Sequence, residues 1–172
     1  VDDLVVDLPS DRLADSLITA ALGVDGVTVE SIRPYAGHID THRELELLEA
    51  ITDAPGDAAR LLADGLPRIF RAGWAIVLDP PADSDRATVL ARSAAAPEAD
   101  AIDAPWWPLS RTAVLDVAQP WAPSEWDALG TELAAAPFGP RVVLVGRPGG
   151  LVWRAAELMR LNHLCGIAAS VS

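Results

Sequence analysis

The chain has no lysine and a single cysteine in 172 residues. All 13 of its basic residues are therefore arginine, against 25 acidic residues, which gives a net charge of −12. A chain this acidic offers no cluster of basic residues to the phosphate groups of a nucleic acid, and anionic lipid surfaces repel it. We therefore expect neither nucleic acid nor membrane as a partner. Cys165 alone excludes an internal disulfide and a cysteine-only zinc site. No uncharged apolar run approaches the ~20 residues of a membrane span.

The usual signatures of catalysis are also missing. The sequence contains neither Gly-x-Ser-x-Gly nor His-Glu-x-x-His. His163 and Cys165 lie about 200° apart around a helix, so they do not form a nucleophile and its base. We therefore expect a protein that is not an enzyme and that holds no cofactor and no metal. No secretory signal is present, so the expected compartment is the cytoplasm.

With 51% hydrophobic residues, the chain can bury a core, and its pattern divides into two unequal parts. Residues 2–8 alternate apolar and acidic side chains and predict a strand. Ser10 is a good N-cap for a helix that Gly23 ends, and the β-branched residues of 27–32 predict a second strand. Such a unit is too small to bury its own core.

The longer second part predicts four main helical regions and four strands. The Thr41–Glu44 capping box begins the first helix, and apolar runs with little polar alternation predict buried strands. We expect the strand at 141–145 to be central. The expected helices are 41–52, 57–71, 123–136 and 152–169, and the expected strands are 74–78, 87–91, 111–117 and 141–145.

The segment from His38 to His42 is the one place with metal-ligating residue types close together. Its histidines and Asp40 alternate, which suits zinc. However, Thr41 already serves as an N-cap, and the next histidine, His163, stands alone. The pattern favours a polar turn between the two parts.

Residues 41–172 resemble a GAF-type domain. The resemblance rests on Leu45–Leu78, with its broken helix and a glycine before Trp74, and on Arg141–Ala169, with its apolar strand, glycine turn and closing helix. It implies an antiparallel sheet with helices on one face and a small-molecule pocket between sheet and loops. The Asn-Lys-Phe-Asp-Glu signature of the cyclic-nucleotide-binding members and the Cys-His pair of the bilin-binding members are absent, so no ligand class follows.

Residues 1–36 resemble the second half of an ACT domain, whose order is βαββαβ. Asp2–Leu8 would be its third strand, Ser10–Leu22 its second helix and Val27–Ile32 its last strand. The phrase Leu22-Gly23-Val24-Asp25-Gly26-Val27 is typical of that helix-to-strand passage. The ligand loop of the family belongs to the first half, so the resemblance implies that this chain is a fragment or a processed product. It extends to actinobacterial ACT-domain proteins of unknown role, and it implies an amino acid as ligand.

Together these patterns predict an α+β fold. We expect a partial ferredoxin-like (ACT) segment over 1–36 and a GAF-like antiparallel sheet, with helices packed on one face, over 41–172.

The candidate ligand-binding residues are four tryptophans and one arginine. Six tryptophans beside one tyrosine and two phenylalanines is an unusual balance, and flat side chains can stack on a ligand. The competing interpretation of the tryptophans is that they belong to the core. Arg147 lies in the Gly146–Gly150 segment, which could present backbone N–H groups and a helix start to an anion, and the competing interpretation there is a tight turn. The candidates are Trp74, Trp106, Trp107, Arg147 and Trp153.

The last helix is apolar on two sides, so it must be covered on two sides. One stripe contains Val152, Met159, His163 and Ile167. The other contains Leu151, Leu158, Leu161 and Cys165. The sheet can cover one side of the helix, and either a partner chain or the helix expected at 41–52 can cover the other. We assign the second stripe to the interface of a homodimer.

The function we expect is regulatory: sensing of a small molecule, an amino acid first, through ACT/GAF-like domains. The alternative is a structural or dimerisation module with no ligand, whose pocket is filled by its own tryptophans.

Overall fold

The computed structural model describes residues 14–32, 37–82 and 85–172. The chain forms two compact units, Val1–Ile39 and Asp40–Ser172. In the first unit, α1 (Ala14–Leu22) lies within the helix predicted from Ser10 to Leu22. The strand predicted over 2–8 falls outside the described residues.

The strand predicted over Val27–Ile32 is wrong. These residues belong to no strand, and the backbone N–H of Val27 instead donates to the carbonyl oxygen of Val24 in a turn, at 3.2 Å. A strand needs a hydrogen-bonded neighbour, and the described part of this unit contains none. Residues 15–32 are all exposed or half-buried, as expected for a unit too small to enclose a core.

The rest of the chain forms one six-stranded antiparallel sheet with helices packed on it. The sheet order is β3-β2-β1-β6-β5-β4, so β1 and β6 are central, as predicted for 141–145. The helical elements are α2 (Gly37–Asp53), the 3-10 turn η1 (Pro55–Asp57), α3 (Ala58–Phe70), α4 (Ser124–Ala128) and α5 (Ala155–Val171). The strands are β1 (Trp74–Asp79), β2 (Arg86–Arg92), β3 (Ala101–Asp103), β4 (Ala113–Leu115), β5 (Glu132–Phe138) and β6 (Arg141–Arg147).

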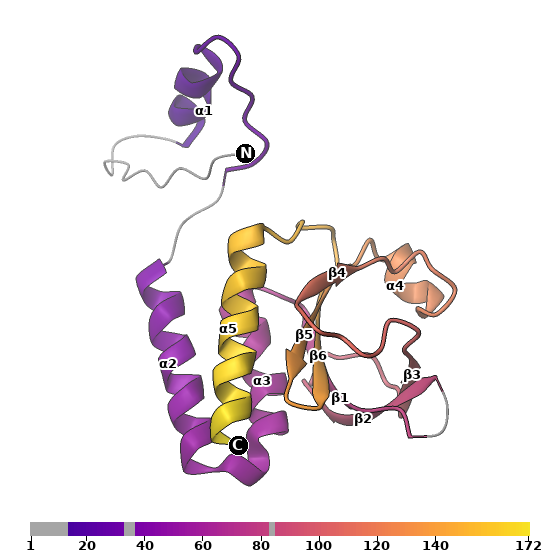
Figure 1. Cartoon of the computed structure of the whole chain (residues 1–172). Helices are drawn as coiled ribbons and strands as arrows, with labels where there is room; N and C mark the ends of the chain where they lie inside the picture. The colour runs from indigo at the N-terminus through magenta and orange to yellow at the C-terminus, as the bar shows by residue number, and fades with distance from the viewer. Residues whose placement is uncertain (1–13, 33–36, 83–84) are drawn as a thin grey trace. The chain divides into compact units, whose positions relative to one another are not determined.

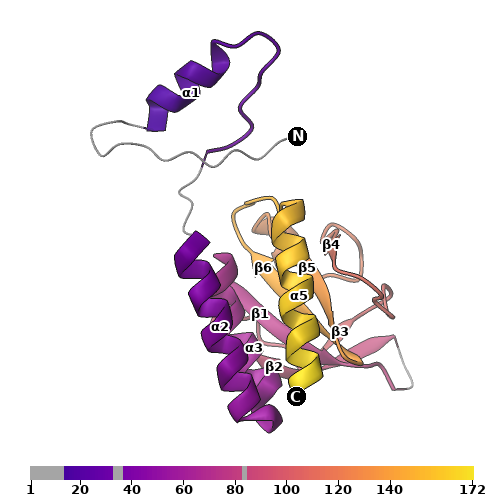
Figure 2. The same ribbon diagram turned by 60° about the vertical axis from the view of Figure 1, so that its left-hand side comes forward.

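Each face of the sheet has its own core. Helices α3 and α5 cover one face, and α2 lies beside them (Figures 1 and 2). The loops between β2 and β5, with α4, form the second core on the opposite face. Strand β1 serves both cores, because Ala75 and Val77 face the helices while Trp74, Ile76 and Leu78 face the loops. This confirms that the apolar run at 74–78 is buried on both faces.

Helix α2 begins at Gly37, four residues before the predicted cap at Thr41. The polar turn expected at 38–42 is therefore helical, and no capping box starts the helix at Thr41. The carboxylate of Glu44 is used differently, because it accepts a hydrogen bond from Nε of Arg160 on α5 at 3.0 Å. The pair joins the two helices across 116 residues of sequence.

The helix predicted over 123–136 is also wrong beyond its first turn. Helix α4 ends at Ala128, Gly130 turns the chain with φ 56°, and residues 132–138 form β5. Alanine has a high intrinsic helix propensity, but packing overrides it here. The small side chains of Ala134 and Ala136 are fully buried in the core beneath the helices. The short strand β3 was not predicted, and β4 is shorter than the expected 111–117.

Trp74 and Gly146 are paired across β1 and β6, and the indole ring lies over the glycine. A Cβ atom at position 146 would overlap Cε2 and Cζ2 of that ring. The largest side chain of β1 therefore fits only because its partner on β6 has no side chain.

We predict that Gly146→Ala destabilises the chain by about 1–3 kcal/mol, because a buried ring must move to accept the methyl group. The matched control is Gly56→Ala, where a Cβ meets no atom within 4 Å. It should change the free energy of unfolding by about 0.5 kcal/mol or less. Urea denaturation of both variants is the measurement, and equal effects would contradict the close packing of Trp74.

Candidate functional site

Five of the six tryptophans form a continuous row on the loop-covered face of the sheet. Trp74 and Trp126 are buried, with 4% and 2% of their surface exposed and ring centroids 5.0 Å apart. The row continues from Trp126 to Trp121 at 6.4 Å, then to Trp106 and Trp107 in two steps of 5.9 Å. The aromatic side chains therefore contact one another within the second core.

Trp106 and Trp107 are not part of a strand. They lie in the turn that follows β3, both half-buried, with their rings on the same core. Nε1 of Trp106 is buried and has no hydrogen-bond partner. The face where a GAF-type pocket was expected is thus largely filled by indole rings, with one unused N–H donor among them.

Arg147 and Trp153, the other two candidates, meet on the helix-covered side. Arg147 is 3% exposed, and its guanidinium carbon lies 3.6 Å from the centroid of the Trp153 ring. Its Nη2 and Nε donate to the carbonyl oxygen of Phe70 at 2.6 and 3.2 Å. Both carboxylate oxygens of Glu157 accept further hydrogen bonds, at 2.7 and 3.2 Å. The five candidates therefore divide into two groups, on opposite faces of the sheet.

The surroundings of Arg147 give it a structural role. The carboxylate of Glu157 also accepts the backbone N–H of Arg154 at 2.9 Å, which completes the first turn of α5. One guanidinium thus joins the end of α3, the end of β6 and the start of α5. Because its N–H groups already donate to protein acceptors, Arg147 has little left to offer an anion.

The thiol of Cys165 is fully buried, and burial raises its pKa to about 12. A thiol with that pKa is protonated at neutral pH, whereas a nucleophilic cysteine must be a thiolate. Cys165 packs in the helix-side core, and His163 is exposed on the other side of α5.

Two of the four residues assigned to the homodimer interface keep some exposure, since Leu151 is 53% exposed and Leu158 is half-buried. Leu161 and Cys165 are fully buried within the chain, so a second copy does not reach them. Met159 and Ile167, from the other stripe, are 58% and 49% exposed. Beside them, a shallow groove of about 220 Å³ runs between α2 and α5. It is lined by Glu44, Leu45, Leu48, Arg160, His163, Leu164 and Ile167.

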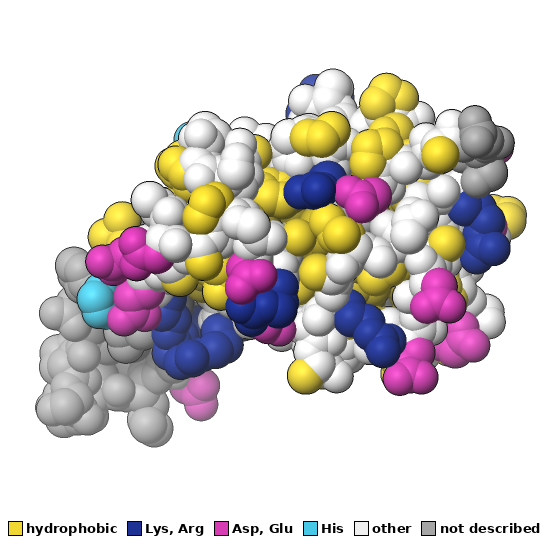
Figure 3. All heavy atoms as spheres, turned by 90° about the horizontal axis from the view of Figure 1, so that it is seen from below, with side chains coloured by type: hydrophobic (Ala, Val, Ile, Leu, Met, Phe, Trp, Pro, Cys, Tyr) yellow, Lys and Arg dark blue, Asp and Glu magenta, His cyan; other side chains and the backbone are white. Residues whose placement is uncertain are grey.

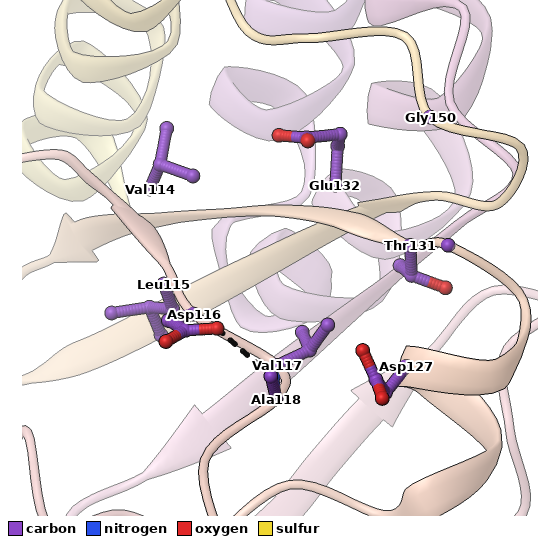
Figure 4. Close-up of a pocket in the computed structure, with 10 residues that line it drawn as sticks. Val114, Leu115, Asp116, Val117, Ala118, Asp127, Thr131, Glu132 and Gly150 are labelled. Carbon is purple, nitrogen blue, oxygen red and sulfur yellow. Dashed lines mark hydrogen bonds between the residues drawn. The ribbon is translucent and has the colours of Figure 1, made fainter.

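A larger pocket of about 400 Å³ lies where β4 ends, beside α4 and the start of β5 (Figure 4). None of the five candidate residues lines it. Three carboxylic acids do, namely Asp116, Asp127 and Glu132, together with apolar side chains of β4 and the residues after it. The remaining lining residues are Val114, Leu115, Val117, Ala118, Gly130, Thr131 and Gly150.

The three carboxylates differ in the hydrogen bonds that they accept. Asp116 accepts hydrogen bonds from the Gln119 side chain at 2.8 Å and from the Ala118 backbone N–H at 3.0 Å, which lower the pKa of its carboxyl group. The carboxylates of Asp127 and Glu132 accept no hydrogen bond from any residue that the structure describes. Sequence reasoning missed this pocket because it read 123–136 as one helix. Only the strand β5 brings Glu132 next to the end of β4.

The surface shows charges of both signs standing among apolar side chains, as the view in Figure 3 illustrates. In the described part of the chain, no group of three or more histidine, cysteine or acidic residues is arranged to hold a metal ion. Within the same residues, the helices are too short or too polar to cross a membrane.

We predict that Arg147→Met lowers the free energy of unfolding by about 3–5 kcal/mol, because the half-buried carboxylate of Glu157 and the carbonyl oxygen of Phe70 both lose the guanidinium as hydrogen-bond donor. The matched control is Arg141→Met on the same strand, which breaks a 2.8 Å ion pair with Asp79. Both partners of that pair are more than a third exposed, so the expected loss is about 1 kcal/mol or less. Chemical denaturation compares the two, and similar losses would contradict the role given to Arg147.

No protein-family model matches the chain, and no curated protein matches it. Solved structures with a similar architecture include a GAF domain and a reductase. The GAF domain of an Acinetobacter phosphoenolpyruvate-protein phosphotransferase aligns with a TM-score of 0.56 at 10% identity, over 79% of this chain and 93% of that one.

The second structure is a free methionine-R-sulfoxide reductase from Neisseria meningitidis, determined with its substrate. It aligns with a TM-score of 0.60 at 15% identity, over 83% of this chain and 95% of that one. One neighbour is a GAF domain and the other is an enzyme, and identities this low carry the fold alone. The chain has a GAF-like α+β fold.

Proposed function

We propose that the chain is a non-catalytic regulatory domain that binds a small molecule, with an amino acid as the first ligand class to test. The observation that carries this proposal is the pocket of about 400 Å³ beside β4, within the size range of small-molecule sites. Its lining combines apolar side chains with a few polar groups, as such sites do.

The amino-acid class is supported by two features of different kinds. The first is the sequence resemblance of residues 1–36 to half of an ACT domain, of which the structure contains the helix α1 but not the strand expected at Val27–Ile32. The second is the chemistry of the pocket, because Asp127 and Glu132 offer acceptors to an α-ammonium group.

We further propose that ligand binding is passed on through the assembly of a homodimer. The ligand would act by favouring one of two dimer arrangements, which requires different affinities for the two. The apolar side chains that favour self-association are those on the outer side of the helices: Leu45 of α2, 60% exposed, and Met159 and Ile167 of α5. Their burial in a dimer would remove apolar surface from water.

The row of tryptophans favours a second function, a structural or dimerisation module without a ligand. Trp74, Trp126 and their neighbours already fill the loop-covered face. In that case the pocket beside β4 binds no ligand, and the exposed apolar side chains of α2 and α5 mediate dimerisation.

We predict that at least one of the 20 amino acids, at 10 mM, raises the melting temperature of the purified chain. A ligand that binds only the folded state stabilises it by mass action, and each kcal/mol raises Tm by roughly 2–4 °C in a domain of this size. Thermal melting is measured first, and sedimentation velocity with the same ligand then reports the assembly.

The controls separate the two functions. Val117→Trp fills the pocket and should abolish the shift, whereas Leu90→Trp on the exposed side of β2 should keep it. If no amino acid changes Tm and the chain still dimerises, the module without a ligand is the correct account.

A further inference from the structure

The exposed side of α5 carries no acidic side chain and no arginine. The structure describes this helix throughout, and its two charged residues, Glu157 and Arg160, are half-buried and ion-paired with Arg147 and Glu44. A helix face that meets water usually carries charged groups, so an uncharged one is suited to contact with another protein surface. The exposed residues are Ala155, Ala156, Met159, Asn162, His163, Gly166, Ile167, Ser170 and Val171.

The charge of the chain favours a second copy as the partner on this face. At a net charge of −12, two copies repel each other, and along the exposed side of α5 no charged side chain adds to that repulsion. Two uncharged faces can meet without removing any charge from water, whereas a strongly charged partner would find no counter-charge there. Leu45 of α2, which is 60% exposed, extends the apolar surface, because the two helices run side by side (Figure 2).

His163 is the one exposed residue of α5 that can become charged by taking up a proton. It lines the groove between α2 and α5 together with Leu45 and Ile167. The charged residues of the same groove are Glu44 on α2 and Arg160 on α5, and these two are ion-paired with each other. An imidazolium at this place would therefore meet a carboxylate that is already engaged and a guanidinium that repels it.

We propose that protonation of His163 dissociates a homodimer in which α5 of each copy packs on α5 of the other. This inference rests on the proposed function, because it assigns the regulation of the same homodimer. Histidine is the side chain whose charge ordinarily changes between pH 5 and 8. A neutral imidazole is buried at a moderate cost, whereas a charged one would lose its hydration without gaining a partner. A two-fold contact contains two copies of the residue, which doubles the effect.

The direction of the effect separates this mechanism from general electrostatics. Acidification makes the chain less negative, which would tighten any association that net charge limits. Burial of His163 acts in the opposite direction, because the separated copies take up protons that the dimer excludes. By linkage, the dimer is favoured where histidine is neutral and is weakened as the pH falls through the range in which histidine becomes charged.

The test is sedimentation velocity of the full chain over a range of concentrations at pH 7.5 and pH 5.5, with matched ionic strength. We expect the dissociation constant of the dimer to be about ten-fold or more higher at pH 5.5. His163→Gln keeps a neutral polar side chain, so it should form the dimer and lose most of this pH dependence. The matched control is His42→Gln on α2, which removes a histidine that pairs with Glu46 at 3.2 Å and should keep the pH dependence.

A second pair of variants shows whether α5 forms the contact. Met159→Glu places a negative charge on the exposed side of α5, where Met159 is 58% exposed, and should weaken the dimer at pH 7.5 by about ten-fold or more. Leu90→Glu adds the same charge on the exposed side of β2 and should leave the dissociation constant unchanged. Equal losses in the two variants would mean a general repulsion between acidic copies, and the inference would fail.

The outcomes also separate this inference from the homodimer on which it rests. If the dimer is as stable or more stable at pH 5.5, or if the His163→Gln dimer keeps the full pH dependence, the regulation by His163 is wrong and the homodimer stands. If the chain is monomeric at both pH values, both proposals fail.

Discussion

The buried guanidinium of Arg147 is the interaction on which the arrangement of the helices depends. Burying a charge is costly unless it is paired and hydrogen-bonded, and Arg147 meets both conditions through Glu157 and the carbonyl oxygen of Phe70. Because these partners belong to α5 and to the end of α3, satisfying one charge fixes two helices against β6. The ring of Trp153 covers the guanidinium, and its Nε1–H donates a hydrogen bond to the carbonyl oxygen of Glu132 at 3.1 Å.

This anchoring leaves the two faces of the sheet with different roles. The helix-covered face is closed by Arg147 and its partners, and the loop-covered face by indole rings that pack on one another. Space for a small molecule is therefore found at the edge of the sheet, where β4 is short and α4 turns back at Gly130. The wall of that pocket is continuous with the anchored region, because Glu132 contributes its side chain to the pocket and its carbonyl oxygen to Trp153.

The sequence predicted the parts of the fold whose signal is local. The apolar runs at 74–78 and 141–145 predicted two buried strands, of which the second was expected to be central, and the GAF-like α+β fold was confirmed. The alanines of 132–136 have a high helix propensity, and only the neighbouring strands β4 and β6 make this segment β5. The pocket was missed for the same reason, since its acidic residues come together through the β4–β5 pairing. The tryptophans were recognised as a group, but their partners depend on tertiary packing.

The central claim is that a small molecule occupies the edge of the sheet while the tryptophan-filled face stays closed. The most direct measurement is a ¹H–¹⁵N NMR titration of the chain with the amino acid that raises its melting temperature most. The account predicts that backbone signals of residues 114–118 and 130–132 move with ligand concentration, while the indole N–H signals of Trp74 and Trp126 stay in place. Movement of the indole signals, with the signals at the edge of the sheet unchanged, would contradict it.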